Sequence, residues 1–356
     1  MLSDKEIISR SITILRFPLI VCVCFIHSKT TSSFNVSPIY YCLSNLLSEG
    51  IARIAVPLFF TISGYLFFNH MQNGFLEKIK KRVKSLFIPM LLWDILAVLF
   101  MLWVQTYNFT DFIYRDKAIA DWNISDYISS IYSLYHPLPP FTPPYIYPFW
   151  FIRDLFITIL FSPILYWCYK RFKIYFITLL GLLWFIKPSG GLWFIPLGAA
   201  PLFFFELGAY FTLEKQNIVS FLNKKSRIIY ILYLGILIID LLTKTYSYNI
   251  YIHRIGILIG SVAVCKLTIN YAQSTNKLKV WEYLSTISFF VFAFHEPYMS
   301  FFNKIVWGDT IQSSNSLMIL SYILNPLLII VLAIILQRLL KLCCPKFLSL
   351  LSGERI

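Results

Sequence analysis

About ten apolar stretches of near-spanning length constrain this chain more than any other feature of its sequence. A helix needs about 20 apolar residues to cross the hydrocarbon core of a bilayer. Only 13% of the 356 residues are charged, against about 25% in a soluble domain. The sequence therefore predicts an all-α integral membrane protein, a bundle of about ten transmembrane helices. The expected spans are 12–28, 52–68, 86–106, 149–168, 174–187, 193–213, 228–243, 251–272, 281–301 and 317–341.

The distribution of basic residues predicts which side of the membrane each connection faces. With a cytoplasmic N-terminus, the inner segments hold twenty Lys and Arg residues and the outer segments hold six. This excess follows the positive-inside rule and places both termini in the cytoplasm. The net charge of +14 lies in short turns rather than in one patch, so we expect membrane lipids and no nucleic acid as partners. The predicted domains are a transmembrane domain, 1–345, and a short cytoplasmic tail, 346–356.

The prolines and cysteines indicate what the connections and the apolar stretches can hold. The longest outer connection, about 107–148, contains the run HPLPPFTPPYIYP. Prolines at this density disfavour helix and sheet, which indicates a stiff loop over the outer mouth of the bundle; a purely structural loop would have the same composition. The seven cysteines include no CxxC pair and mostly lie in apolar stretches. We therefore expect neither a disulfide framework nor a metal site.

The first span carries two ionisable residues, Arg16 and His27, which are eleven residues apart. Eleven steps of about 100° return a helix to within about 20° of its starting face, and a rise of about 1.5 Å per residue separates the two groups by roughly 16 Å. A cation near one membrane surface thus shares a helix face with an imidazole near the other. Ionisable groups inside a span are costly and usually line a cavity. We therefore hypothesise that Arg16 and His27 have a functional role.

Other ionisable residues of the spans gather near the predicted outer ends. They are Arg53, Arg153, Asp154, Asp240, Arg254, His295 and Glu296. Chance scatter would not favour one depth, so we expect an outward-facing polar chamber. Structural alternatives stay open, because arginines at span ends can extend to lipid headgroups and His295 can cap its helix. Arg153 and Asp154 are adjacent, so they point about 100° apart and need not pair with each other.

Two motifs follow the first span. In RIAVPLFFTISGYLFF, residues 53–68, Ser63 and Gly64 permit a close backbone approach, either between helices or to a slender ligand. The run KIKKRVKSLFIP, residues 78–89, contains Lys78, Lys81, Arg82 and Lys84. By itself this run is an ordinary inner-loop charge cluster, but it is also suitably placed to hold phosphates at the cytoplasmic mouth.

These residues resemble the membrane-bound acyltransferase-3 family, the bacterial O-acyltransferases that modify polysaccharides, lipopolysaccharide and peptidoglycan. Arg16 and His27 match its R/K-x10-H signature, and the 53–68 run is similar to its second-helix motif. Weaker likenesses are the basic run, with Lys81-x-x-Lys84 where many members have two arginines, PFWFIRDLF at 148–156 and FFVFAFHEPYM at 289–299. The likeness covers about 1–345. Many members carry a glutamate in the fourth helix where this chain has Arg153 and Asp154, which leaves the assisting carboxylate open.

The resemblance implies a membrane O-acyltransferase, a transferase of groups other than amino-acyl groups. Its donor would be cytoplasmic acyl-CoA, usually acetyl-CoA, and its acceptor a hydroxyl of an extracytoplasmic or lipid-linked glycan. The implied location is the bacterial inner membrane, as a multi-pass protein with both termini cytoplasmic. The donor-binding residues would be Arg16, Lys78, Lys81, Arg82, Lys84, Ser63 and Gly64. The catalytic residues would be His27, Arg53, Arg153, Asp154, His295 and Glu296.

The residues leave several alternatives open. His27 can act as a general base or carry the acyl group itself, Arg53 or Arg153 can stabilise an oxyanion, and Asp154 or Glu296 can orient the imidazole. A polytopic transporter or flippase for a glycan precursor would also have ten helices and an outer chamber, but it would not consume acyl-CoA. A membrane glycosyltransferase would need paired carboxylates or larger outer loops. The acceptor glycan and the oligomeric state are undetermined by the sequence.

Overall fold

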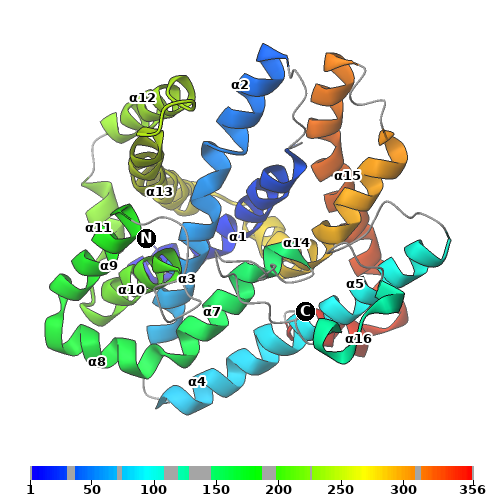
Figure 1. Ribbon diagram of the computed structural model, residues 1–356. Helices are drawn as coiled ribbons and strands as arrows, with labels where there is room; N and C mark the ends of the chain where they lie inside the picture. The colour runs from blue at the N-terminus through cyan, green and yellow to red at the C-terminus, as the bar shows by residue number, and fades with distance from the viewer. Residues whose placement is uncertain are drawn as a thin grey trace. The chain divides into compact units, whose positions relative to one another are not determined.

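Every regular element is helical in the part of the chain that the computed structural model describes (Figure 1). The described residues are 2–29, 37–69, 74–107, 119–127, 146–186, 198–224, 227–308 and 314–354. The predicted all-α class is therefore confirmed for these residues. Most of the proline-rich connection, 108–118 and 128–145, lies outside them, so the loop over the outer mouth stays a prediction.

The chain divides into two compact units, which are described separately. The first comprises Met1–Met71 and Phe203–Gln337. Its helices are α1 (Asp4–Ser28), α2 (Pro38–Leu47), the 3₁₀ turn η1 (Ile51–Ile54), α3 (Ala55–Phe68), most of α10 (Ala199–Leu213), α11 (Ile218–Asn223), α12 (Ile228–Leu242), α13 (Asn249–Ser274), α14 (Leu278–Val306) and most of α15 (Asn315–Cys343). Helix α1 packs against both α13 and α14, and it is therefore the centre of this unit.

The second unit comprises Gln72–Leu202 and Arg338–Ile356. Its elements are α4 (Gly74–Arg82), the π-helical turn η3 (Val83–Phe87), α5 (Ile88–Thr106), η4 (Ile119–Asp121), η5 (Tyr147–Phe149), α7 (Trp150–Leu160), α8 (Ser162–Phe172), α9 (Ile174–Ile186) and α16 (Pro345–Leu351). The segment predicted as a short tail thus contains a packed helix. The indole nitrogen of Trp93 donates to the carbonyl of Leu351 at 3.0 Å, which holds α16 against α5.

Five helical stretches of the described chain are long and apolar enough to cross a bilayer. They are Asp4–Ser28, Pro38–Phe68, Gly74–Thr106, Asn249–Ser274 and Asn315–Cys343. The fourth predicted span is not one straight helix, because α7 and α8 meet at a bend of 63° and Pro163 occupies the first turn of α8. Helices α9, α10 and α12 are apolar but shorter. The ten-span count and the cytoplasmic termini stay predictions.

Helices α3 and α10 cross at very short range in the first unit. A Cβ atom added to Gly64 would lie 1.9 Å from the carbonyl oxygen of Phe205, and one added to Gly208 would lie 1.9 Å from that of Thr61. Small residues at such a crossing allow backbones to touch. The close approach that Gly64 permits is therefore one between two helices. The donor-binding role of Ser63 and Gly64 stays a prediction.

Candidate functional site

Two histidines from different helices meet at the C-terminal end of α1. The rings of His27, on α1, and His295, on α14, have centroids 5.2 Å apart and planes inclined by 52°. His295 is fully buried, and its Nδ1 is hydrogen-bonded to the carbonyl oxygen of Phe292. A carbonyl only accepts, so Nδ1 carries the ring proton and Nε2 presents a lone pair. That Nε2 has no hydrogen-bond partner within the described chain.

Arg16 and His27 both face α14, as the eleven-residue spacing requires. The Nη1 of Arg16 donates to the hydroxyl of Ser285 at 3.1 Å, while His27 contacts His295 further along the same partner helix. The residue numbers of the two contacts increase together along α1 and along α14. The two helices therefore run parallel. Parallel helices are what the predicted topology requires of two odd-numbered spans.

Helix α14 changes direction beside the histidine pair. Glu296 has the extended backbone angles φ −119° and ψ 137°, and Pro297 follows it. Proline lacks an N–H and clashes with the preceding turn, so it ends the regular helix here. The Oε2 of Glu296 accepts from the Ser300 hydroxyl at 2.8 Å, and the carboxylate lies close enough to Cys24, one turn before His27, to act on it electrostatically. Glu296, on α14, therefore lies near the pair of His27 and His295.

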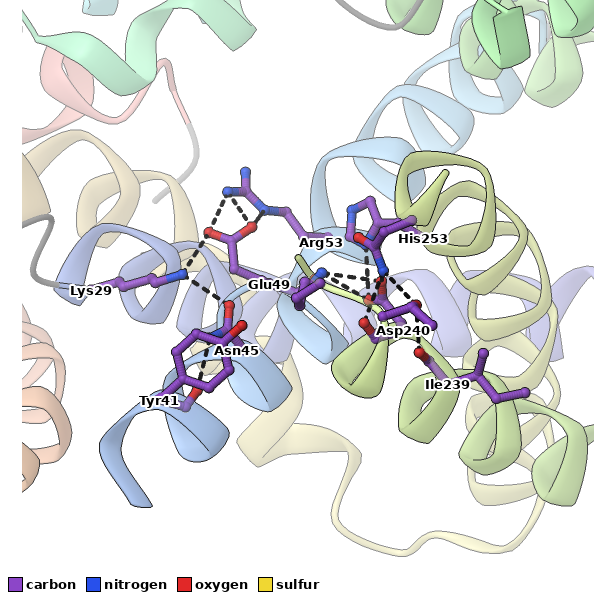
Figure 2. Close-up of polar contacts among 11 residues, drawn as sticks. Lys29, Tyr41, Asn45, Glu49, Arg53, Ile239, Asp240 and His253 are labelled. Atoms are coloured by element: carbon purple, nitrogen blue, oxygen red, sulfur yellow. Dashed lines mark hydrogen bonds and ion pairs between the residues drawn. The ribbon is translucent and has the colours of Figure 1, made fainter. Parts of the chain in front are cut away.

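A charged cluster lies where α2 ends and leads into η1 (Figure 2). Arg53 donates to Glu49 through Nε at 3.0 Å and through Nη2 at 2.9 Å, which makes a two-pronged ion pair. Lys29 donates to Asn45 at 3.1 Å and lies 3.6 Å from the Glu49 carboxylate. The Arg53 charge reaches His27. Its side chain is 38% exposed, so the cation that acts on the imidazole is also open to solvent.

The polar cluster continues onto the hairpin of α12 and α13. Lys244 pairs with Asp240 at 3.0 Å and donates to the backbone carbonyl of Glu49 at 3.5 Å. The Nδ1 of His253 lies 3.1 Å from the same Asp240 carboxylate. Asp240 is nearly fully buried, and these groups together with Asn249 surround it (Figure 2). The ends of α1, α2, α12, α13 and α14 thus bring polar groups together within the first unit.

Sequence reasoning did not select Glu49 or Lys29 as site residues. The available signal was the spacing of Glu49 and Arg53, which are opposite charges four residues apart. Lys29 is one of the six basic residues of the predicted outer segments, and it follows His27 by two residues. A short polar stretch beside a span is predicted as a loop, so the sequence does not predict which ion pairs its residues form.

The other predicted site residues belong to the second unit. Arg153 and Asp154, on α7, are buried and pair with each other, with Nε and Nη2 of the arginine both 2.9 Å from Oδ1. Although adjacent side chains diverge by about 100°, the long arginine bends back to its neighbour. The basic run lies on α4 and η3. Lys81 and Lys84 are exposed there, whereas Lys78 and Arg82 are half-buried.

The first unit also contains a cavity of about 330 Å³ among α1, α3, α10, α11 and α13. Its walls are almost wholly apolar, with Leu15 and Tyr65 among them. Neither Arg16 nor His27 lines it. On α1 the lining residues Ile8, Ser11, Ile12 and Leu15 form a stripe about 100° from the Arg16–His27 face. This cavity is therefore separate from the route that the sequence predicts for the donor.

Known proteins resemble the chain along almost its whole length. Residues 9–338 match the sequence model of a family described as an acyltransferase domain, the acyltransferase-3 family. The succinoglycan biosynthesis protein ExoH of Rhizobium meliloti (strain 1021) is 25% identical over 368 residues, which cover 98% of this chain and 93% of that protein. No solved structure matches the chain. The family match includes every residue of the histidine site and of the charged cluster. The chain therefore belongs to the acyltransferase-3 family.

Proposed function

We propose that this protein is a membrane O-acyltransferase that moves an acyl group, acetyl in the simplest case, from cytoplasmic acyl-CoA to a hydroxyl of an extracytoplasmic or lipid-linked glycan. The observation that carries the proposal is the contact between His27 and His295 beside Arg53, in a chain of acyltransferase ancestry. The location would be a bacterial inner membrane, with both termini in the cytoplasm.

The donor would enter from the cytoplasmic side. Lys78, Lys81, Arg82 and Lys84 would bind nucleotide phosphates. Arg16 would also bind phosphate, since its planar guanidinium suits a phosphate oxygen pair. Arg16 is half-buried and already points at α14, where Ser285 holds it. The pantetheine arm would then follow the face of α1 that carries both Arg16 and His27. This route would deliver the thioester to the imidazole over roughly 16 Å of helix.

The chemistry at His27 balances without any further reactant. A neutral imidazole removes the proton from the acceptor hydroxyl while the oxygen attacks the thioester carbonyl. The carbon–oxygen bond forms, the carbon–sulfur bond breaks, and the imidazolium returns its proton to the departing thiolate of CoA. Arg53 would stabilise the negative oxygen that develops in between. An acyl-His27 intermediate would reach the same products in two steps.

His295 would act as a positioning residue for His27. Its Nδ1 proton is used on a backbone carbonyl, so its Nε2 can only accept a hydrogen bond from a neighbouring donor. Accepting from one ring nitrogen of His27 would fix the tautomer in which the other nitrogen is the base. Orienting a catalytic histidine through its second nitrogen is a common arrangement in enzymes.

A glycan acceptor is supported by the similarity to ExoH, whose name assigns it to succinoglycan biosynthesis. The two proteins align over nearly their full lengths, so no separate acceptor-binding domain distinguishes them within the aligned region. The acceptor would therefore be bound by the helices and their outer connections.

The test measures thiol release from acetyl-CoA by purified protein in lipid nanodiscs supplied with glycan acceptor isolated from cells that carry this protein, with the His27→Ala variant beside the wild type. We expect thiol release by the wild type and its loss by at least 100-fold in His27→Ala, since base catalysis contributes about 10²- to 10⁴-fold. Tyr175→Ala, an exposed change on α9, is the matched control and should retain the wild-type rate. Wild-type protein that never releases thiol would overturn the proposal and favour a transporter. A fully active His27→Ala would instead overturn the assignment of the chemistry to His27.

A further inference from the structure

Two exposed tyrosines lie in the turn that joins α12 to α13. Tyr246 is 56% exposed and Tyr248 is 49% exposed, although both are large aromatic side chains. Their rings are stacked, with centroids 5.2 Å apart and planes inclined by only 17°. Together they present a broad aromatic surface at the same end of the hairpin as Asp240 and His253.

The backbone of this turn is held in place before any ligand arrives. The Asn249 side-chain amide donates to the Asp240 carbonyl at 2.9 Å and to its carboxylate at 2.8 Å. The backbone N–H of Tyr246 donates to Thr243, and that of Asn249 donates to Tyr246, at 2.9 and 3.0 Å. A surface ordered in advance loses little conformational entropy when it binds. The two rings are thus supported by a rigid turn.

Polar contacts run from this turn as far as Arg53. Lys244, in the turn, contacts Asp240 and the backbone of Glu49. Glu49 in turn binds Arg53 (Figure 2), and the Arg53 charge acts on His27 through space. All these residues belong to the first unit. The aromatic turn is thus connected, through Lys244 and Glu49, to the cation that acts on His27.

We propose that Tyr246 and Tyr248 form a binding subsite for a sugar ring of the acceptor glycan. One face of a pyranose is lined by C–H groups and is apolar enough to lie on an aromatic ring, while its hydroxyls need hydrogen-bond donors and acceptors at the rim. The tyrosine pair supplies the first, and the polar groups around Asp240, His253 among them, belong to the same end of the hairpin. A neighbouring sugar of the same glycan then reaches towards His27. This inference rests on the proposed function, because it assigns part of its acceptor site.

The experiment uses cells that carry this protein naturally, so the acceptor need not be identified. The chromosomal copy is deleted and replaced by wild type or by variants. Acyl groups released by mild alkali from the isolated surface glycan are measured per amount of protein in the membrane. We expect the double variant Tyr246→Ala/Tyr248→Ala to lower this ester content by at least tenfold. The double variant Tyr246→Phe/Tyr248→Phe keeps both rings and should retain at least half of it.

The control Tyr175→Ala removes an exposed tyrosine from α9 and should leave the ester content unchanged. Tyrosines are also common at membrane interfaces, where they act as anchors. Loss of ester only in proportion to lost protein, equal losses in the Ala and Phe pairs, or wild-type ester in the Ala pair would each overturn the subsite. Failure of the proposed function shows differently, since neither gene deletion nor His27→Ala would then change the ester content.

Discussion

At the scale of single residues, the site depends on which nitrogen of each histidine holds a proton. His295 is fixed by a backbone carbonyl and presents an acceptor nitrogen inside a fully buried environment. Buried polar atoms nearly always find a partner in folded proteins. The nearest ring is that of His27, which has to be presented in one tautomer to act as a base. In the proposed mechanism, the fixed backbone contact of His295 would fix the catalytic orientation of His27.

Replacing His295 by alanine should slow acyl transfer without weakening donor binding. We expect kcat to fall by at least tenfold, about 1.4 kcal/mol in the barrier, because His27 loses the partner that fixes its tautomer. KM for acetyl-CoA should change by less than about threefold, since the phosphates would bind at the other end of α1. Steady-state kinetics with purified protein measure both constants. An unchanged kcat would remove His295 from the mechanism.

Arg16 should show the opposite kinetic pattern. Arg16→Ala is expected to raise KM for acetyl-CoA about tenfold or more with a smaller effect on kcat, because it removes a cation from the predicted phosphate end. Ser285→Ala is the matched control, as it removes the hydroxyl that accepts from Arg16 but leaves the charge in place. That control should change KM by less than about twofold. Equal KM values for wild type and Arg16→Ala would refute a donor-binding role.

At the scale of helices, the α3–α10 crossing fixes the helix that begins just after the charged cluster. Two glycines face the opposite backbone there, and carbonyl oxygens of a helix cannot shift as the end of a side chain can. A methyl group at either position must push the helices apart along their whole contact. The orientation of Arg53, which directly precedes α3, then depends on two residues that carry no functional group.

Gly64→Ala and Gly208→Ala should each destabilise the protein. Because the added Cβ would lie 1.9 Å from a backbone oxygen, we expect a loss of at least about 1–3 kcal/mol, seen as a lower thermal midpoint or a lower yield of monodisperse protein. Gly235→Ala on α12 is the control, since its Cβ would meet nothing within 4 Å. It should be neutral or gain up to about 1 kcal/mol from helix propensity. Three equal midpoints would contradict this account of the crossing.

At the scale of the whole molecule, the predicted orientation can be read from the exposed cysteines. Cys42, on α2, follows the first span and should face outward, whereas Cys343, at the end of α15, should face the cytoplasm. In single-cysteine variants, a membrane-impermeant maleimide should label Cys42 in intact cells. Cys343 should react only after permeabilisation. The reverse pattern would show that the chain is inserted the other way round.

Much of the helical pattern could be predicted from the sequence, because apolar length is a local property. The break between α7 and α8 was not, since a proline in an apolar run is compatible with both a kink and a continuous span. The sequence predicts a tail where α16 lies, because its seven residues are too few for a clear helical pattern. The burial of α16 depends on Trp93, which is far away in sequence.

The candidate site was predictable where spacing along one helix decides it. Arg16 and His27 share a face because of helical geometry alone, and both contact α14. Contacts between helices were less accessible. Nothing local indicates that Lys29 lies beside Glu49, or that Lys244 reaches the backbone of Glu49, because these pairs depend on how α1, α2 and α12 pack. Their assignment required the folded arrangement.

The packing of α16 against α5 has a practical consequence for anyone who shortens or tags this protein. Leu348 and Leu351 are buried, and the indole of Trp93 is bonded to the Leu351 carbonyl. Truncation at residue 345 would remove α16. It would expose apolar surface on α5 and leave the indole N–H of Trp93 without its hydrogen-bond acceptor. Affinity handles placed after residue 356 therefore need a flexible spacer, and a shortened version for crystallisation should retain everything through Gly353.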